Sequence, residues 1–441
     1  MKRDSDCEGR MPKRTAKSAR RAGRRSGEFL GTRDPALLEA TLVHLRALVG
    51  FDTRNPPRAI GTGGIFDYLR AQLPGFHVRV TDHGAGAVSL FAVRGKPKLL
   101  FNVHLDTVPD SPQWSASPFE LRVTTDRAIG LGACDIKGAA AGLLAVANAS
   151  SGDMALLFTS DEEGADPRCV RTFLDAFLPL PSGEGRGEGT RGAEHFRNAE
   201  PSPQRCALGA THRLSRGERG FQAVIVAEPT RCRAVLAHRG IQSVRVRFEG
   251  RAGHASGEQK PSDNALHQAV RWSTAALDFA ESQSKESFGG LHGLRFNIGR
   301  IEGGIKANMI APEAELRFGI RPLPSMDMDG LLERFRTLVE PAPAAFEETF
   351  RGSPLPADAA RAELHRRDAH GLAEGLGIPV GDAVDFWTEA ALFSQAGYTT
   401  FVYGPGDIAQ AHGADEWVEL AQLHRYTASV LRIVGGGLHE R

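Results

Sequence analysis

The sequence predicts an α/β protein that carries a second, smaller domain inserted into its chain. Between residues 64 and 160, strand-like apolar runs alternate with helical periodicity, which is typical of a sheet covered by helices on both faces. From about residue 240 to 350 the order changes to β-α-β-β-α-β, the order of a ferredoxin-like domain. The α/β pattern returns after this segment, so the second domain interrupts the first.

The first predicted element is a helix that begins at Asp34. Asp34 can cap this helix, Pro35 suits its first position, and Leu38, Leu42 and Leu45 fall on one face. The elements that follow in this part of the chain are expected as helices at 64–73 and 136–150 and strands at 77–81, 87–94, 98–104 and 154–160.

The inserted domain and the segment after it are predicted in the same way. In the inserted domain we expect strands at 241–249, 294–301, 313–321 and 346–351 and helices at 264–281 and 328–339. Beyond it we expect a helix around 357–375 and a final helix from residue 416. The predicted organisation is a first α/β part (34–238), the inserted domain (239–351) and a second α/β part (352–441).

Two segments do not fit this pattern. Residues 178–220 hold eight glycines and four prolines with almost no apolar periodicity, so we expect a disordered insertion. Residues 1–33 hold eleven Lys or Arg and lack the apolar core of a secretory signal. We expect a basic disordered arm there, or a true start at Met11 or later; nucleic-acid binding by the arm is the less favoured alternative.

The overall composition excludes several classes of protein. The formal net charge of +1 gives no general attraction to nucleic acid or to a membrane surface. No stretch reaches the about eighteen uninterrupted apolar residues that a membrane span needs. The five cysteines are scattered without a CxxC pair, which argues against a structural zinc site and favours a reducing compartment. We therefore expect a cytoplasmic protein.

Acidic and histidine side chains stand just past three apolar strands. His104 and Asp106 follow the run "KLLFNV", Glu162 and Glu163 follow "ALLFTSD", and Glu228 follows "AVIVA". Ligands of α/β sheets gather at the carboxyl ends of the strands, so these groups can converge although the sequence separates them widely.

Two loop residues, Asp135 in "GLGACDIKG" and His412 in "YGPGDIAQAHGADEW", extend this set. Taken singly, a loop histidine is most often solvated, and an acidic run is most often a charged surface. Together, two histidines with several carboxylates and no thiolate suit zinc, cobalt or manganese, and the number of acids suggests two ions. Two neighbouring cations can polarise a carbonyl and activate water, which predicts a hydrolase.

These motifs also carry a family resemblance. In order along the chain, "NVHLDTVP", "GLGACDIKG", "TSDEEG", "VAEPT" and "AHGADEW" resemble the metal motifs of the M20 peptidase and deacylase family of dinuclear zinc aminoacylases. The resemblance covers about residues 34–436. It implies a mixed-sheet, zinc-exopeptidase-like catalytic domain with the ferredoxin-like domain as a lid and dimerisation domain. It further implies a homodimer and two divalent ions, Zn²⁺ with Co²⁺ as the alternative.

The resemblance implies a role for each matching residue of the catalytic domain. The metal ligands would be His104, Asp135, Glu163, Glu228 and His412, with Asp135 bridging both ions. Asp106 would orient the imidazole of His104, and Glu162 would be the general base. Relatives have a cis peptide after the bridging aspartate, so the bond from Asp135 to Ile136 is expected to be cis.

The lid adds three residues. "GRAGHAS" resembles the lid motif whose histidine, here His254, would reach the active site of the partner subunit and stabilise an oxyanion. "GGIKANMIAPEAELRFGIRPLP" resembles the segment whose asparagine and arginine, here Asn308 and Arg321, would bind polar groups of the substrate. Without the resemblance, a turn-capping asparagine and a surface-paired arginine are favoured.

Within the family, "FDTRNPP", "DFWTEAALF" and "YGPGDIAQAH" resemble the acetylornithine deacetylase branch, and most closely its members that act on N-acetylcitrulline. The expected reaction is hydrolysis of N-acetyl-L-citrulline to L-citrulline and acetate in arginine biosynthesis, with N-acetylornithine as the alternative substrate. An acidic pocket residue, Asp385 or Glu389, would favour cationic ornithine unless it is a structural or capping acid. An M20 dipeptidase, a succinyl-diaminopimelate desuccinylase and an inactive scaffold protein are the other hypotheses.

Overall fold

The computed structural model describes residues 34–58, 60–164, 166–177, 221–258 and 260–436. The segments predicted as a basic disordered arm (1–33) and as a disordered insertion (178–220) lie outside the described residues. The chain divides into two units, Met1–Asp34 and Pro35–Arg441, and the fold described below belongs to the second.

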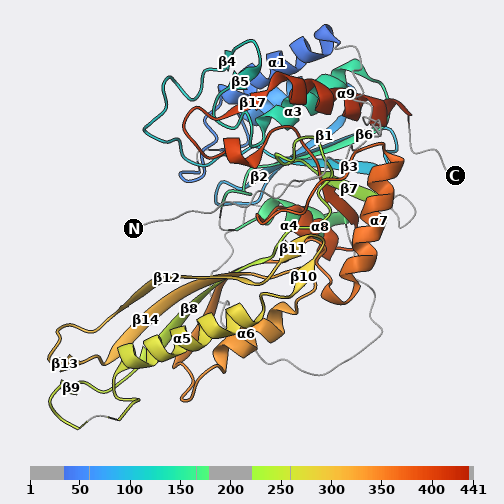
Figure 1. Ribbon diagram of the computed structural model, residues 1–441. Helices are drawn as coiled ribbons and strands as arrows, with labels where there is room; N and C mark the ends of the chain where they lie inside the picture. The colour runs from blue at the N-terminus through green and yellow to red at the C-terminus, as the bar shows by residue number, and fades with distance from the viewer. Residues whose placement is uncertain (1–33, 59, 165, 178–220, 259, 437–441) are drawn as a thin grey trace, which may run out of the picture. The chain divides into compact units, whose positions relative to one another are not determined.

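A six-stranded sheet forms the centre of this fold, in the order β1-β2-β6-β3-β7-β16 (Figure 1). Its strands are β1 (His77–Asp82), β2 (Val88–Arg94), β3 (Leu99–His104), β6 (Met154–Thr159), β7 (Ala223–Val226) and β16 (Thr399–Val402). The strands β6, β3, β7 and β16 run parallel to one another, whereas β1 and β2 are antiparallel to their neighbours. The predicted mixed sheet is confirmed.

Helices cover both faces of the central sheet, as predicted. The helices α1 (Pro35–Val49), α3 (Lys137–Ala149) and α9 (Leu420–Gly436) pack together on one face, while α4 (Arg168–Phe177) and α8 (Ala390–Gln395) pack on the other. The strand residues Phe101 and Leu100 face opposite ways and are both buried, in two separate core clusters. Burial on both faces explains why the central strands are continuously apolar rather than alternating.

Two further helices complete this part of the chain. Helix α2 spans Ile65–Ala71, and helix α7 spans Ala362–Gly375 after a short 3₁₀ turn at Ala359–Arg361. Among the described residues, no helix is both long and apolar enough to cross a membrane.

A second sheet, here called the lid sheet, contains four antiparallel strands in the order β12-β14-β8-β15. Its strands are β8 (Ile241–Glu249), β12 (Arg295–Gly303), β14 (Glu313–Arg321) and β15 (Ala345–Gly352), and helices α5 (Ala265–Ser282) and α6 (Met328–Arg336) lie along one face (Figure 1). This is the predicted β-α-β-β-α-β order. The fully buried Trp272 of α5 packs against Phe318 and Phe335 and fixes the helix on the sheet.

Two short antiparallel strand pairs accompany the lid sheet. One pairs β9 (Gly253–His254) with β13 (Met309–Ile310), and the other pairs β10 (Ser287–Phe288) with β11 (Leu291–His292). Because β13 lies between the end of β12 and the start of β14, the β9/β13 pair stands at the end of the sheet away from Arg321.

The predicted start of the final helix, at residue 416, is wrong. The helix begins at Leu420, because Trp417–Glu419 form strand β17 of a small sheet with β5 (Arg127–Ile129) and β4 (Arg122–Val123). Val418 is fully buried in this pairing. The prediction used only the pattern of neighbouring residues, whereas the strand with which this segment pairs lies far away in the sequence.

Candidate metal centre

The parallel strands of the central sheet present their carboxyl ends at one edge, and the predicted polar residues lie there. His104 is the last residue of β3, Glu162 and Glu163 follow β6, and Glu228 follows β7. This edge is where ligands of α/β sheets bind.

A first group of candidate ligands consists of His104, Asp135 and Glu228, all buried. The Nε2 atom of His104 lies 3.3 Å from Oδ1 of Asp135 and 3.8 Å from Oε2 of Glu228. The Nδ1 atom lies 3.0 Å from the backbone carbonyl oxygen of Asp106. Because a carbonyl can only accept, Nδ1 carries the proton and Nε2 is left as a ligand atom.

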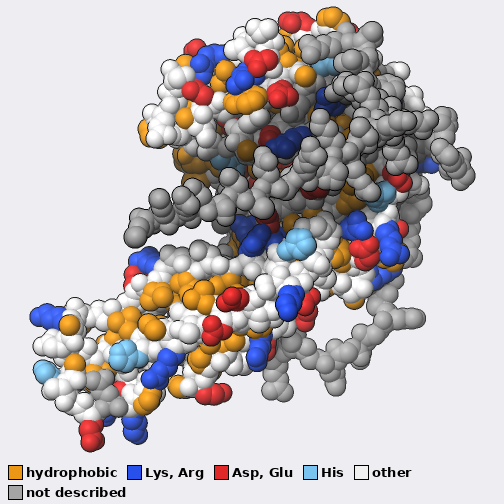
Figure 2. Space-filling view, viewed as in Figure 1, with side chains coloured by type: hydrophobic (Ala, Val, Ile, Leu, Met, Phe, Trp, Pro, Cys, Tyr) orange, Lys and Arg blue, Asp and Glu red, His pale blue; other side chains and the backbone are white. Residues whose placement is uncertain are grey.

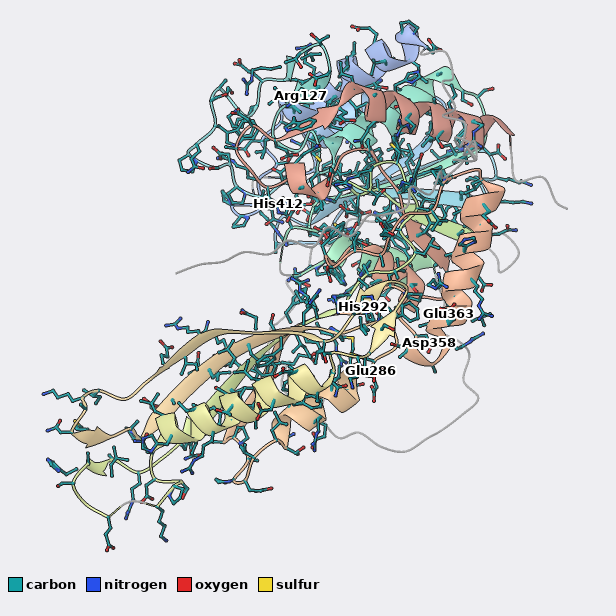
Figure 3. The ribbon with its side chains drawn as sticks, viewed as in Figure 1. Arg127, Glu286, His292, Asp358, Glu363 and His412 are labelled. Carbon is teal, nitrogen blue, oxygen red and sulfur yellow. The ribbon has the colours of Figure 1, made fainter. Side chains whose placement is uncertain are left out.

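A second group consists of Asp135, Glu163 and His412. The Nε2 atom of His412 lies 3.0 Å from Oδ2 of Asp135 and 3.0 Å from Oε1 of Glu163. His412 follows the short helix η2 (Ile408–Gln410), in a left-handed loop conformation with φ of 60° (Figure 3). Asp135 therefore belongs to both groups, and its peptide bond to Ile136 is cis, as the resemblance implies.

The donors in both groups fit a pair of divalent cations. The ligand atoms of each group lie within 4.8 Å of one another. Oδ1 of Asp135 is buried without a hydrogen-bond partner among the described residues, which is costly for a carboxylate unless a cation neutralises it. Imidazole and carboxylate donors without thiolates suit zinc and other borderline divalent ions.

The electrostatics of the centre show a local excess of negative charge. Burial alone would lower the pKa of His104, but Asp106, Asp135 and Glu228 raise it well above its usual value. The side chains of Asp135 and Glu163 raise the pKa of His412 to about 10. Both imidazoles are therefore drawn toward the charged form, because the surrounding carboxylates favour positive charge at this point.

Asp106 organises the loop after β6 more than it orients His104. Its carboxylate accepts the backbone N–H of Glu162 (3.3 Å) and of Glu163 (3.0 Å), and also the side-chain amide of Asn55 (2.9 Å). Its nearer carboxylate oxygen is 3.5 Å from Nδ1 of His104, farther than its own backbone carbonyl. The contact that orients the imidazole is thus mainly the main-chain oxygen.

Glu162 lies beside the two groups but belongs to neither. Burial raises the pKa of its carboxyl well above the usual value; His104 opposes this shift, and Glu228 and Glu163 add to it. The preceding acid, Asp161, has a different task, because its Oδ2 accepts the backbone N–H of Arg168 and Cys169 at the start of α4. Asp161 therefore caps the start of α4.

The structure does not bring the three predicted lid residues together. His254 is exposed in β9, with Nδ1 2.7 Å from Oγ of Ser256, and Asn308 is exposed just before β13. Arg321 ends the nine-residue strand β14, whose length of about 27 Å separates it from the β9/β13 pair, at which the other two lie. Within one chain, these residues cannot meet at one small substrate.

Two residues at the centre escaped the sequence-based selection. Asn55 lies in "FDTRNPP", which suggested only the branch of the family, and it supports Asp106. Glu416 lies in the quoted "AHGADEW" and is buried against the loop of Asp135. The sequence feature that could have identified Glu416 is an acidic residue four positions after His412 within a metal motif. No ligand role was implied for it, so it was not selected.

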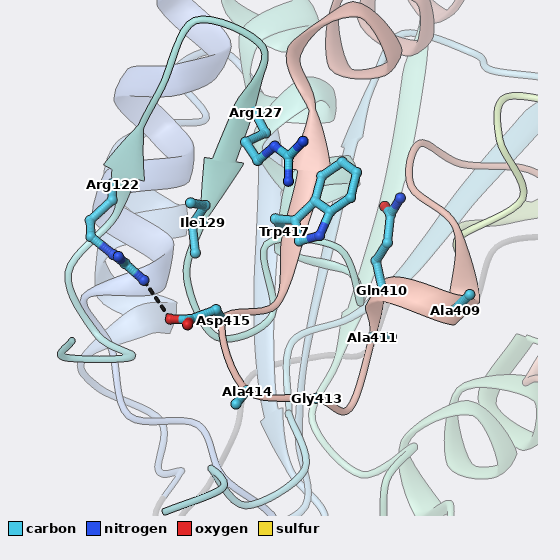
Figure 4. A pocket seen from close by; sticks show the side chains of 10 residues that line it. All are labelled: Arg122, Arg127, Ile129, Ala409, Gln410, Ala411, Gly413, Ala414, Asp415 and Trp417. Carbon is cyan, nitrogen blue, oxygen red and sulfur yellow. Dashed lines mark hydrogen bonds and ion pairs between the residues drawn. The ribbon is translucent and has the colours of Figure 1, made fainter. Parts of the chain in front are cut away.

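A pocket of about 510 Å³ adjoins the His412 loop (Figure 4). Ala411 and Gly413, which flank His412, line it together with Trp417, whose ring lies under the guanidinium of Arg127. None of the candidate ligands lines this pocket, so its cationic and aromatic wall is not part of the metal centre.

Two ligand groups that share a carboxylate, at the strand ends of a mixed α/β sheet, are the arrangement of a hydrolase that uses two divalent metal ions. The chain belongs to the M20 peptidases: the family described as Peptidase family M20/M25/M40 matches residues 100–435.

Relatives and solved structures agree with this membership. The N-acetyl-L-citrulline deacetylase of Xanthomonas campestris pv. campestris is 61% identical over 402 residues, 91% of this chain and 99% of that protein. The acetylornithine deacetylase of Vibrio vulnificus is 29% identical over 358 residues, 78% of this chain and 83% of that protein.

Among solved structures, the aminopeptidase PepT of Bacillus cereus has a TM-score of 0.61 and 16% identity, covering 90% of this chain and 98% of that one. The Bacillus subtilis YXEP protein, described as a dinuclear metal binding peptidase from the M20 family, has a TM-score of 0.57 and 14% identity, covering 92% and 100%. At these identities the comparison shows a shared fold.

Proposed function

We propose that this chain is a metal-dependent amino-acid N-deacetylase that hydrolyses N-acetyl-L-citrulline to L-citrulline and acetate, in arginine biosynthesis. The observation that carries the proposal is Asp135, whose carboxylate belongs to both ligand groups. The 61% identity to an N-acetyl-L-citrulline deacetylase, over 91% of the chain, supports the substrate.

The proposed cofactor is a pair of Zn²⁺ ions, with Co²⁺ as the alternative. His104 and Glu228 would hold one ion, Glu163 and His412 the other, and Asp135 both. Bound there, the ions would polarise the amide carbonyl and lower the pKa of a water molecule.

We assign proton transfer to Glu162. Its raised pKa suits a carboxyl group that accepts a proton and later returns it. Glu162 takes the proton of the attacking water as the carbonyl carbon gains an oxygen. It delivers that proton to the nitrogen as the C–N bond breaks, so acetate and a free amine leave.

The lid residues support a homodimer. Arg321 stands at one end of the lid sheet, and His254 and Asn308 stand beyond the other end, about 27 Å away along β14. If all three contact one substrate, His254 and Asn308 must come from a different copy of the chain than Arg321 does. A two-fold dimer provides this arrangement, because each copy then serves the other's site.

Exposed apolar side chains and an open strand edge lie where such a dimer can form. Val270 and Leu277, which lie seven residues apart on one face of α5, are both more than half exposed. Ile301 of β12 is 43% exposed. Figure 2 shows hydrophobic side chains gathered on this side of the lid sheet. β12 is also an edge strand, whose unpaired backbone groups can accept a second strand.

Arg321 is the proposed partner of the substrate's α-carboxylate. Its guanidinium is partly buried, and desolvation lowers its pKa, with Asp385 opposing this shift. Among the described residues it makes no hydrogen bond or ion pair through its side chain. A planar guanidinium can bind a carboxylate through two hydrogen bonds, so a substrate carboxylate would complete this site.

The two acids that could favour a cationic side chain are both engaged elsewhere. Asp385 forms an ion pair with the fully buried Arg239. Glu389 is buried, accepts a hydrogen bond from Oγ1 of Thr159 at 3.0 Å, and has its pKa raised by burial to about 8. Neither supplies a free negative charge for ornithine, which supports the neutral ureido side chain of citrulline.

A substrate panel tests the proposal. The purified protein, supplied with Zn²⁺ or Co²⁺, is assayed for release of the amine from N-acetylcitrulline, N-acetylornithine, N-succinyl-diaminopimelate and a dipeptide. We expect the highest kcat/KM for N-acetylcitrulline. A higher value for N-acetylornithine would assign the chain to the alternative that its relatives at 28–30% identity suggest. Tight metal binding without any hydrolysis would favour a scaffold protein.

A further inference from the structure

Glu416 is a buried carboxylate that holds the loop of the shared candidate ligand. It is 2% exposed, and its Oε1 accepts the backbone N–H of Cys134 (2.8 Å) and of Asp135 (2.9 Å). Its Oε2 accepts the backbone N–H of Gly132 (3.1 Å). Its own backbone oxygen accepts the N–H of Gly130 (3.0 Å), so one residue ties down most of this loop.

The side chains on either side of Glu416 point elsewhere. Asp415 pairs with Arg122, and the Trp417 ring stacks with Arg127; both line the pocket of Figure 4. Glu416 turns inward like Val418, whereas Trp417 and Glu419 are partly exposed. The inward acid is therefore not a wall residue of the pocket.

The loop held by Glu416 is irregular, and neighbouring backbone oxygens also hold it: those of Pro118 and Gly130 accept the N–H of Leu131 and of Ala133. Residues 131–136 form turns, and regular structure resumes only at Lys137, where α3 begins. Gly132 adopts a φ of 77°, and a Cβ there would lie 2.8 Å from a methyl carbon of Thr107. The three N–H bonds to the carboxyl oxygens of Glu416 are directional, and two of them hold the backbone at Cys134 and Asp135.

We propose that Glu416 is a positioning residue of the two-cation centre, which couples the segment of His412 to the loop of Asp135. It lies four residues after His412, so one segment supplies a candidate ligand and also grips the loop of the ligand shared by both groups. The inference rests on the proposed two-metal function. Hydrogen-bonded supports of metal ligands typically change metal affinity by about 10–100-fold when they are mutated.

Glu416→Gln separates positioning from simple packing, because glutamine has nearly the same shape. Its amide oxygen can still accept the N–H groups of Cys134 and Asp135. Its NH₂ group would lie opposite the N–H of Gly132, and two donors cannot form a hydrogen bond. The matched control is Glu419→Gln on the same segment, whose carboxylate accepts from the side chain of Gln422 at 3.2 Å.

Metal titration tests the inference. Each protein is stripped with a chelator and titrated with Co²⁺ alone, followed by calorimetry and by visible absorption of the bound ion. We expect two equivalents in the wild type and in Glu419→Gln. In Glu416→Gln we expect affinity lowered about 10–100-fold for at least one ion, with an altered Co²⁺ spectrum. Excess Co²⁺ should restore kcat toward the wild-type value, which it would not do for a packing defect.

The outcomes are distinguishable. Co²⁺ affinity and spectrum in Glu416→Gln equal to those of the wild type would overturn the inference and leave the proposed function intact. A wild type that binds no Co²⁺ would instead overturn the proposed function. If circular dichroism shows that Glu416→Gln does not fold, Glu416→Asp, which keeps the charge but shortens the reach, takes its place, and unchanged affinity there overturns the inference equally.

Discussion

Oδ2 of Asp135 lies 3.0 Å from Nε2 of His412, and the other oxygen of the same carboxylate lies 3.3 Å from Nε2 of His104. One side chain thus stands between two imidazoles that come from distant parts of the chain. If each imidazole holds a cation, changes at Asp135 and at His412 must have different consequences for metal stoichiometry.

Asp135→Asn should therefore weaken binding of both ions, whereas His412→Ala should weaken chiefly one. Asparagine keeps the shape but loses the charge that two cations share, and His412 belongs to one ligand group only. Metal content after dialysis, measured by mass spectrometry, checks this, with the exposed His77→Ala at the start of β1 as control. Equal loss in the two ligand variants would contradict the shared role of Asp135.

Glu162→Gln should lower kcat by about 10²–10⁴-fold, the usual contribution of a general acid or base. The amide keeps the size of the side chain but cannot carry the transferred proton. Co²⁺ titration should give wild-type stoichiometry, because Glu162 belongs to neither ligand group. The exposed Glu363→Gln on α7 is the control (Figure 3). Retained turnover in Glu162→Gln would remove this residue from the mechanism.

Mixing two inactive variants should restore activity if the lid histidine serves the partner subunit. His254→Ala and Glu162→Gln subunits, exchanged in a dimer, leave one site with an intact Glu162 and an intact His254 from the other copy. Random exchange makes half the dimers hybrid, so we expect roughly a quarter of wild-type activity. Mixtures that stay as inactive as the separate variants would show that each chain uses its own histidine, or that no dimer forms.

His238 should make the fold sensitive to mild acid. It is fully buried, and burial lowers its pKa to about 4, from an unfolded value near 6.5. The unfolded chain binds this proton first as the pH falls, so the contribution is present above pH 6.5 and is lost between about 6.5 and 4.

His238→Gln should therefore lose less stability than the wild type between pH 8 and pH 5, by about 2 kcal/mol. Chemical denaturation in the presence of a chelator measures this difference without changes in metal binding. The exposed His77→Gln should follow the wild type. Parallel pH profiles for His238→Gln and the wild type would contradict the assignment.

Much of the fold was visible in local patterns. The apolar periodicity of Leu38, Leu42 and Leu45 placed α1, and the β-α-β-β-α-β order of the lid sheet matches the structure. The segment at Trp417–Glu419 was misassigned because its pairing with β5 depends on a partner far away in sequence. Strand pairing is a long-range interaction, and a local window does not contain it.

The candidate site was predictable where a polar residue follows an apolar strand. His104, Glu163 and Glu228 could be selected in this way, and the family resemblance added Asp135 and His412. The structure brings these five together in two groups. It was also needed to show that Asp106 serves chiefly the loop after β6, and that Asp385 is bound to Arg239.

By itself, the sequence determined the chemical character of the protein: nitrogen and oxygen donors at strand ends, in the order of a known family. Only the tertiary structure decided which carboxylate lies between two imidazoles, which acids are already neutralised, and that His254 and Arg321 stand at opposite ends of one sheet. The reason is physical: residue type fixes which bonds a side chain can make, but distance and burial, which the fold sets, decide which of them it does make.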